Sequence, residues 1–303
     1  MGNVFIYNKE FALECGEVLP SLKVAYHTFG RLNNDRNNVA WVCHALTANS
    51  DVADWWPGTV EAGRFLDPDK YFVVCANILG SCYGTTGPAE INPATGEPWY
   101  GDFPKVTIRD MVRAHQLLAE HLGISHAKLL IGSSMGGFQC LEWSVMQPDF
   151  AENCVFIATG AQAYPWGVAF NESQRMAIEN DPTFGERNAS AGLRGMATAR
   201  SIALLSYRHL RKIAIPRLTR RKPMPQPTIR LFSTVCSHIS ATKAKNCAVG
   251  STPTPITDCC KPTTRTTWVA TGATWQRRCE ASRRTRWWRA SRATCFFHLP
   301  TIK

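Results

Sequence analysis

Short apolar runs alternate with helix-like segments through the first two-thirds of the chain. Residues 41–43 and 71–75 are compact apolar runs, which are typical of buried strands. Between residues 108 and 122, apolar side chains recur at the spacing of one helix face, and Gly123 follows where a helix commonly ends. This alternation predicts an α/β fold with a mostly parallel sheet.

The same alternation continues beyond this helix. Residues 128–131 and 155–158 have the apolar pattern of buried strands. From residue 164 to 205 the pattern is helical, which predicts helices inserted over the sheet. We therefore expect an α/β core over residues 1–162 and the start of a helical lid over residues 163–208.

The character of the sequence changes sharply after residue 208. Residues 209–303 are rich in Thr, Arg, Pro and Cys and hold 19 basic residues against 2 acidic ones, whereas residues 1–208 hold 15 and 21. The formal net charge of +11 therefore arises wholly in the last third. Arginine and tryptophan cluster at residues 283–289, which permits a patch for nucleic acid or for an anionic membrane.

Composition and cysteine spacing narrow the class of protein. Of the 303 residues 45% are hydrophobic, which is enough for a full core. The 12 cysteines form no C-x-x-C pair, so we predict no metal site, and free thiols agree with a reducing compartment. The N-terminus lacks the features of a secretory signal, and no apolar run approaches transmembrane length. We expect a soluble cytoplasmic protein without membrane or nucleic-acid partners.

The sharpest motif is G-x-S-x-G at residues 132–136, between a predicted strand and a helix expected from about residue 137 to 146. This context predicts that Ser134 is a nucleophile on a strained turn whose neighbours must be small. The backbone N–H of Met135 is the expected first donor to the oxyanion. A phosphate-binding loop is excluded because no Lys-Ser or Lys-Thr follows the glycines.

A second oxyanion donor is expected from a loop that follows an earlier strand. Residues 44–47, His-Ala-Leu-Thr, follow the strand predicted to end at Cys43 and are correctly placed. His44 is open to two interpretations, a catalytic role or a structural one. We favour the structural one.

Five strings of residues, taken together and in this order, resemble the homoserine O-acetyltransferase family. They are residues 44–47, 77–88, 103–112, 132–143 and 166–175. The resemblance covers about residues 12–208 and implies an α/β-hydrolase fold with an inserted helical lid.

The resemblance also implies an activity. An acetyl group would move from acetyl-CoA, the co-substrate, to the hydroxyl of L-homoserine, an early step towards methionine. Ser134 would carry the acetyl group as an ester in a ping-pong sequence. No bound cofactor is implied, and the family suggests a homodimer.

Roles for individual residues follow from the same resemblance. Leu46 and Met135 would supply the N–H groups of the oxyanion hole. Arg175 resembles the family arginine that grips the substrate carboxylate, a task that suits a bidentate guanidinium, and the alternative is a solvated arginine on a helix surface. The family usually has a second histidine shortly after His-Ala-Leu-Thr-Gly, and this chain has Ala-Asn-Ser-Asp at residues 48–51 instead.

The partners of the nucleophile do not appear where the family has them. A serine nucleophile needs a histidine base and an acid that orients it, in the order Ser, Asp or Glu, His for this fold. The family's acid string, Ser-Asp-x-Leu-Phe-Pro, is absent. Asp258 and His298 follow Ser134 in the right order, but residues 257–260 do not have the pattern of a strand end. We therefore do not assign this pair as the base and its acid.

The genetic code offers a better explanation. Residues 293–299, read from the third base of each codon, permit Asp-Leu-Leu-Phe-Pro-Pro, which matches the acid string. At residues 239–246 and 250–261 the same offset also permits amino-acid sequences that resemble the family. Our hypothesis is that the chain is translated out of frame from about residue 209 and stops before the codons of the catalytic histidine. The hypothesis also explains the change in charge and the arginine–tryptophan cluster.

Alternatives of two kinds stay open. As written, the chain lacks two members of the triad and the closing strands of the sheet, which predicts a poorly folded protein with little activity. Within enzymes, the same scaffold also suits a succinyl donor, a serine acceptor or ester hydrolysis. From another class, a non-catalytic protein would bind nucleic acid through its basic tail.

Overall fold

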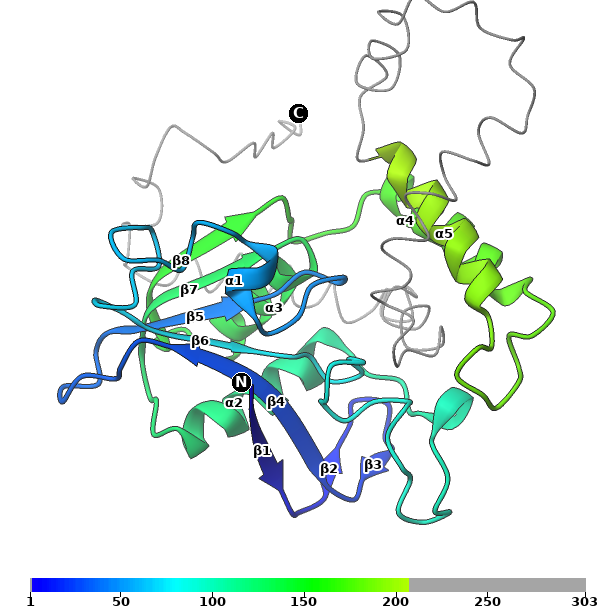
Figure 1. The fold of residues 1–303 in the computed structure, drawn as a ribbon, viewed down its shortest axis with the longest axis horizontal. Coiled ribbons are helices and arrows are strands. Elements are labelled where there is room, and N and C mark those ends of the chain that lie inside the picture. Colours follow the sequence, from blue (N-terminus) through cyan, green and yellow to red (C-terminus); the bar gives the residue numbers. More distant parts are fainter. Residues whose placement is uncertain (1, 207–303) are drawn as a thin grey trace, which may run out of the picture.

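The computed structural model describes residues 2–206, and their central feature is a twisted six-stranded sheet (Figure 1). The strands lie in the order β1-β4-β6-β5-β7-β8. Their bounds are β1 Asn3–Tyr7, β4 Leu22–Phe29, β6 Phe72–Ala76, β5 Val39–Cys43, β7 Ala127–Ser133 and β8 Ala151–Ile157. A separate short hairpin pairs β2 (Phe11–Ala12) with β3 (Val18–Leu19).

Four of the strands are parallel, which confirms the predicted class. β5 pairs with β6 and with β7, and β7 pairs with β8, all in parallel. All five residues of β5 are buried, as the continuous apolar run at its centre predicts for a strand covered on both faces. Parallel strands bring their carboxyl ends to one edge of the sheet, and the loops that leave this edge become neighbours.

Each face of the sheet is covered by a different apolar cluster. α2 (Ile108–His121) and α3 (Met135–Met146) pack on one face, around the fully buried rings of Trp41 and Trp143. α1 (Val52–Trp55) and the segment after it cover the other face through Val52 and Leu66. Figure 1 shows α1 on the side of the sheet opposite α3.

The antiparallel start of the sheet was not foreseen from the sequence. β1 pairs with β4, and β4 pairs with β6, both antiparallel. β1 is an edge strand with one buried residue in five, so its apolar signal is weak. The first strand that the sequence predicted, at residues 41–43, is therefore preceded by two strands of the same sheet, β1 and β4.

Two helices follow the sheet. α4 (Pro165–Glu179) and α5 (Leu193–Ser206) pack against each other and lie to the side of the sheet in Figure 1. The helical pattern expected from residue 164 to 205 is thus observed, with a break at residues 180–192. No helix described between residues 2 and 206 is long and apolar enough to cross a membrane. The tail that the sequence predicts to be out of frame lies outside the described residues, and so does the prediction that the closing strands are missing.

Candidate active site

Ser134 occupies the sharp turn between β7 and α3. Its backbone has φ +52° and ψ −121°, a conformation that a residue with a side chain adopts only under strain. The turn is held in place by the N–H of Ser134, which donates to the carbonyl of Ile157 at 2.9 Å. The side chain is exposed, so its hydroxyl is open to a reactant. This is the geometry that the G-x-S-x-G motif predicts.

Close backbone contacts explain the glycines on both sides of the serine. A Cβ at Gly136 would lie 2.0 Å from the carbonyl oxygen of Cys43. A Cβ at Gly132 would lie 2.2 Å from the carbonyl oxygen of Gly136. Both distances are far below a van der Waals contact, so only glycine lets α3 start this close to β5 and β7.

The strand register places the two expected oxyanion donors at the same edge of the sheet. Cys43 is the partner of Gly132 across β5 and β7. Leu46 and Met135 each lie three residues beyond this matched pair, Leu46 in the segment after β5 and Met135 at the start of α3. The N–H groups of Leu46 and Met135 donate to no oxygen within residues 2–206, and Met135 begins α3, where N–H groups are unpaired. Within the described residues neither N–H therefore has a protein acceptor, and their role in an oxyanion hole stays a prediction.

His44 is buried within this edge, with 1% of its surface exposed. Its Nδ1 lies 2.8 Å from the carbonyl oxygen of Ala45, and its Nε2 accepts the N–H of Ile78 at 3.2 Å. Burial lowers the pKa of His44 to about 4, so the ring is neutral near pH 7. These contacts agree with a structural role, which the sequence analysis preferred to a catalytic one.

A residue of the segment after β6, Asn77, forms a hydrogen bond with the segment after β5. The Asn77 side chain accepts the N–H of Ser50 at 2.8 Å and donates to the carbonyl of Tyr83 at 2.9 Å. Asn77 lies in a string that resembles the family, but its bracing role was not predicted. The signal was present as a polar residue directly after a buried strand, and its partner 27 residues away was not visible in the sequence.

Arg175 lies on α4 and is 2% exposed, so it is not a solvated surface arginine. Its guanidinium is held by Glu172 one turn away, with Nε donating to the carboxylate at 2.7 Å. The guanidinium is therefore paired with a carboxylate of its own helix in this structure. No contact between Arg175 and Ser134 is recorded, so its place in the site stays a prediction.

No histidine nitrogen among residues 2–206 forms a hydrogen bond with the hydroxyl of Ser134. The five histidines of this part instead pack or pair elsewhere: His27 with Ser50, His44 with Ile78, His115 beside Trp41 and Trp143, His121 on Phe5, and His126 with Asp149. The same part of the chain contains no cluster of three His, Cys, Asp or Glu side chains suited to a metal. Asp258 and His298 lie outside it.

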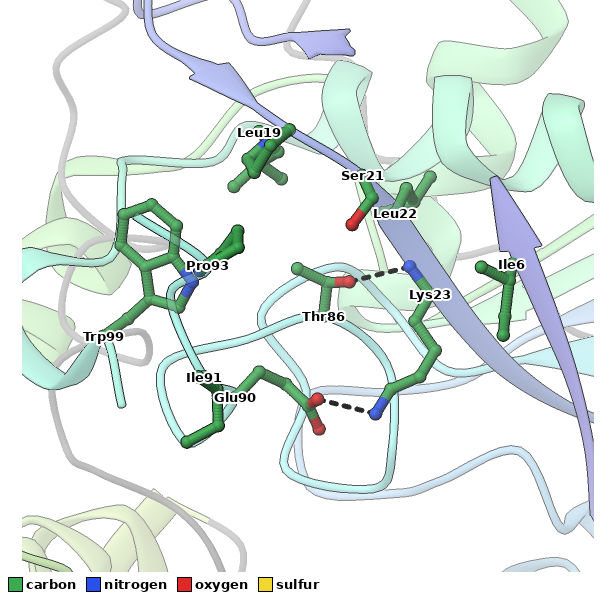
Figure 2. Close-up of a pocket in the computed structure, with 11 residues that line it drawn as sticks. Ile6, Leu19, Ser21, Leu22, Lys23, Thr86, Glu90, Ile91, Pro93 and Trp99 are labelled. Atoms are coloured by element: carbon green, nitrogen blue, oxygen red, sulfur yellow. Dashed lines mark hydrogen bonds and ion pairs between the residues drawn. The ribbon is translucent and has the colours of Figure 1, made fainter. Parts of the chain in front are cut away.

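A shallow pocket of about 190 Å³ lies beside the start of β4 (Figure 2). Its apolar walls include Ile6, Ile91 and Trp99, and a 2.6 Å ion pair between Lys23 and Glu90 spans it. Pockets that enclose a small molecule usually exceed about 300 Å³. It includes none of the predicted site residues, so we do not assign it to the reaction.

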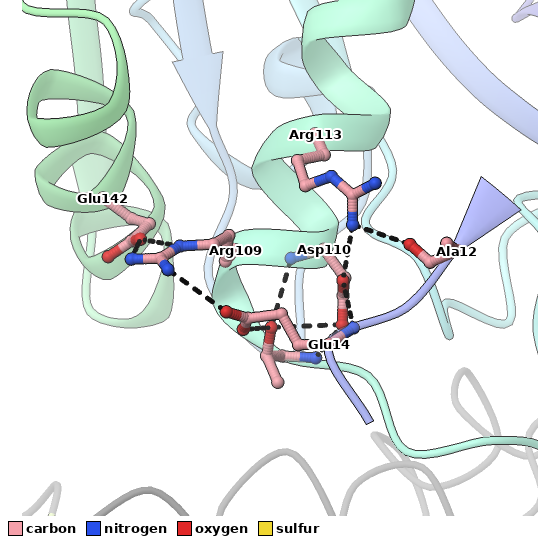
Figure 3. Close-up of polar contacts among 7 residues, drawn as sticks. Ala12, Glu14, Arg109, Asp110, Arg113 and Glu142 are labelled. Atoms are coloured by element: carbon pink, nitrogen blue, oxygen red, sulfur yellow. Dashed lines mark hydrogen bonds and ion pairs between the residues drawn. The ribbon is translucent and has the colours of Figure 1, made fainter. Parts of the chain in front are cut away.

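Residues 103–112, one of the strings that resemble the family, contain side chains that hold helices together (Figure 3). Thr107 caps α2 and forms a capping box with Asp110, whose buried carboxylate also accepts the N–H of Glu14 at 3.1 Å. Arg109 binds Glu142 of α3 at 2.6 Å and Glu14 at 3.2 Å. The network joins α2, α3 and the segment after β2, and it holds α3 behind Ser134.

A model of the alpha/beta hydrolase fold matches residues 42–254, more than half of the chain. The chain belongs to the alpha/beta hydrolase fold family. Within this family, the protein named homoserine O-acetyltransferase from Cyclobacterium marinum is 46% identical over 206 residues, which cover 68% of this chain and 59% of that protein. The enzyme of the same name from Moorella thermoacetica is 47% identical over 209 residues, 65% of this chain and 56% of that protein.

The resemblance inferred from the motifs is thereby confirmed, although this chain spans little more than half the length of those relatives. Solved structures of the alpha/beta hydrolase fold family agree. The homoserine O-acetyltransferase of Bacillus anthracis superposes with a TM-score of 0.75 at 24% identity, over 85% of this chain and 74% of that one, which supports the fold alone. Esterase E22 superposes with a TM-score of 0.74 at 25% identity, over 86% and 78%.

Proposed function

We propose that this chain carries the acyl-accepting part of a homoserine O-acetyltransferase, with Ser134 as the nucleophile. The observation that carries the proposal is the strained backbone of Ser134 at the start of α3, with its side chain exposed. The similarity to enzymes of that name supports the substrate class. The donor would be acetyl-CoA and the acceptor L-homoserine, and the product would enter methionine biosynthesis.

The proposed chemistry has two halves. In the first, Ser134 Oγ forms a bond to the thioester carbon, the carbon–sulfur bond breaks, and CoA leaves as the thiol with the serine proton. In the second, the hydroxyl of homoserine attacks the seryl ester, the acetyl ester of homoserine forms, and Ser134 regains its proton. The N–H groups of Leu46 and Met135 would stabilise the negative oxygen in each half.

Arg175 would bind the carboxylate of homoserine. In the described structure it is buried and paired with Glu172, so substrate would have to take the place of this partner. A guanidinium whose Nε and Nη2 already share one carboxylate oxygen of Glu172 has the right chemistry for that exchange. Substitution by lysine would lose the fork geometry, and we expect an increased KM for homoserine with a smaller change in kcat.

The base and its acid are the unassigned part of the mechanism. We propose that the sequence from about residue 209 is out of frame, and that the correct frame supplies the missing aspartate and histidine. Sequencing the gene across the codons for residues 204–212 and beyond residue 303 tests this. A missing or extra base would support the proposal, and a confirmed sequence would refute it.

Release of CoA from acetyl-CoA, with and without L-homoserine, tests the activity. We expect the chain with the corrected frame to release CoA when homoserine is present, and we expect little release from the chain as written. Ser134→Ala should abolish release in the corrected protein, whereas Ser133→Ala should not, because Ser133 is the last residue of β7 and precedes the strained turn. Release that survives Ser134→Ala would refute the assignment of the nucleophile.

Ester hydrolysis on the same scaffold is the second candidate, because esterase E22 is as similar in structure as the acetyltransferase from Bacillus anthracis. Release of CoA at the same rate without homoserine would favour it. Succinyl-CoA and L-serine, used as alternative substrates, distinguish the remaining acyltransferases. Retention on DNA through the basic tail, lost in salt, would favour the non-catalytic alternative.

We further propose a cytoplasmic homodimer. No disulfide joins the six cysteines within residues 2–206, which supports a reducing compartment. Sedimentation of the corrected protein measures the oligomeric state, and a monomer at micromolar concentration would refute the dimer.

A further inference from the structure

The imidazole of His44 joins two loops at the edge of the sheet that carries Ser134. Nε2 faces the N–H of Ile78 at 3.2 Å, and a backbone N–H is only a donor, so Nε2 must accept. The proton of the neutral ring is therefore on Nδ1, which donates to the carbonyl oxygen of Ala45 at 2.8 Å. The hydrogen-bond pattern thus assigns one tautomer to a ring that is 1% exposed.

The carbonyl that His44 binds belongs to the same peptide group as the N–H of Leu46. A trans peptide is planar, and its C=O and N–H point in opposite directions. When the Ala45 oxygen is held against the imidazole, the Leu46 N–H must point away from it. That N–H donates to no oxygen within residues 2–206, and under the proposed function its acceptor would be the reacting oxygen.

His44 itself is held by its surroundings. Gln139 of α3 is fully buried, and its amide donates to the His44 carbonyl at 3.4 Å. The carbonyl oxygen of Cys43 lies against Gly136, so the first turn of α3 contacts the start of this loop. The segment from Cys43 to Leu46 is therefore connected to the helix that begins directly after Ser134.

We propose that His44 is a positioning residue that orients the Ala45–Leu46 peptide so that the Leu46 N–H serves the oxyanion hole. His44 does not act as the base, because both ring nitrogens are occupied and neither contacts Ser134. The inference rests on the proposed function, since it presupposes that Ser134 is the nucleophile and that Leu46 is a donor.

Two substitutions separate the two hydrogen bonds of the ring. Asparagine in His44→Asn places its amide near the position of Nδ1 and can still donate to the Ala45 carbonyl. Glutamine in His44→Gln reaches the position of Nε2 and can still accept from Ile78, but it loses the bond to Ala45. Both side chains are polar and similar in size, so they serve as controls for each other.

The assay is the reaction of the 303-residue chain with a p-nitrophenyl alkylphosphonate at alkaline pH. Ser134 Oγ forms a bond to phosphorus, p-nitrophenolate leaves, and the serine proton passes to solvent hydroxide. The phosphoryl oxygen then occupies the oxyanion hole. Absorbance of p-nitrophenolate gives the rate, and mass spectrometry of the peptide gives the site of labelling. Near-ultraviolet circular dichroism confirms that each variant is folded.

We expect His44→Gln to slow labelling by about 10- to 100-fold, because a misdirected donor loses most of the effect of an oxyanion contact. His44→Asn should stay within about threefold of the wild type, because it keeps the bond that sets the peptide. Equal rates for the two variants would overturn the inference. Failure to label Ser134 in the wild type would instead overturn the proposed nucleophile, and the inference with it.

Discussion

Acid is expected to destabilise this fold through two buried imidazoles, those of His44 and His115. Burial lowers the pKa of His44 to about 4 and that of His115 to about 3, from an ordinary value of 6.5. At about pH 5 both rings stay neutral in the folded protein and become protonated in the unfolded chain. Stability is therefore fully present above about pH 6.5 and is lost as the pH falls towards the folded pKa values.

The magnitude follows from the shifts. One pKa unit corresponds to about 1.36 kcal/mol, so protonation of the unfolded chain costs each ring about 2 kcal/mol of stability at about pH 5. The two rings together should cost about 4 kcal/mol relative to about pH 8. Paired carboxylates contribute little in this range because they titrate mainly below pH 5.

Urea denaturation followed by tryptophan fluorescence measures this loss, since Trp41 and Trp143 lie in the core with ring centroids 6.1 and 6.4 Å from His115. His115→Leu should halve the loss to about 2 kcal/mol. The same variant should be about as stable as the wild type at about pH 8, because neither His115 ring nitrogen has a hydrogen bond of normal geometry in the described part of the chain and only a contact with the Asn77 backbone is lost.

His126→Gln is the matched control, because His126 is a partly exposed histidine beside Glu152. It should show the full loss of about 4 kcal/mol, as in the wild type. If His115→Leu loses as much stability in acid as the wild type does, the argument from burial is wrong.

Three further substitutions test the scaffold by the same denaturation assay. Gly136→Ala should lower the free energy of unfolding by about 3 kcal/mol or more, because its Cβ would lie 2.0 Å from the Cys43 carbonyl oxygen. Gly167→Ala in α4 is the control and should cost no stability, because nothing lies within 4 Å of its Cβ. Equal costs for the two variants would contradict the close approach. Thr107→Ala removes the cap of α2 and should cost about 1 kcal/mol, and no change would contradict the capping box. Arg187→Ala removes an exposed ion pair with Asp102 and should cost less than about 1 kcal/mol, and a larger loss would show that this contact holds the α4–α5 connection to the core.

The central strands and the turn at Ser134 could be predicted because their signals are local. β5 and β6 are continuous apolar runs of five residues that are rich in valine and aromatic residues, and this length and composition distinguish a strand buried on both faces from a helix. The turn needs small residues within two positions of the serine, and Gly132 and Gly136 meet that need. Such patterns act over a few residues and do not depend on the order of strands.

β1 and β4 were missed because an edge strand and its antiparallel neighbour carry a weaker pattern. β1 buries only Phe5, and its outward-facing Val4 and Ile6 are more than half exposed. Its sequence, Asn-Val-Phe-Ile-Tyr, is apolar on both faces and so lacks the alternation of polar and apolar residues that marks a half-buried strand. The exposure of Arg175 was also undecided, because a helix pattern does not say which neighbour covers a charged side chain.

The sequence by itself determined the α/β class, the strained turn, the position of Ser134 and the likeness to homoserine O-acetyltransferases. Only the tertiary structure decided that Cys43 lies beside Gly132, that Ile78 and Ala45 share the ring of His44, and that Asn77 braces Ser50. These contacts join residues up to 89 positions apart in the chain. These contacts arise because the strand order β6-β5-β7 brings separate loops to one edge of the sheet. That order is set by packing of the whole core and not by any local run of residues.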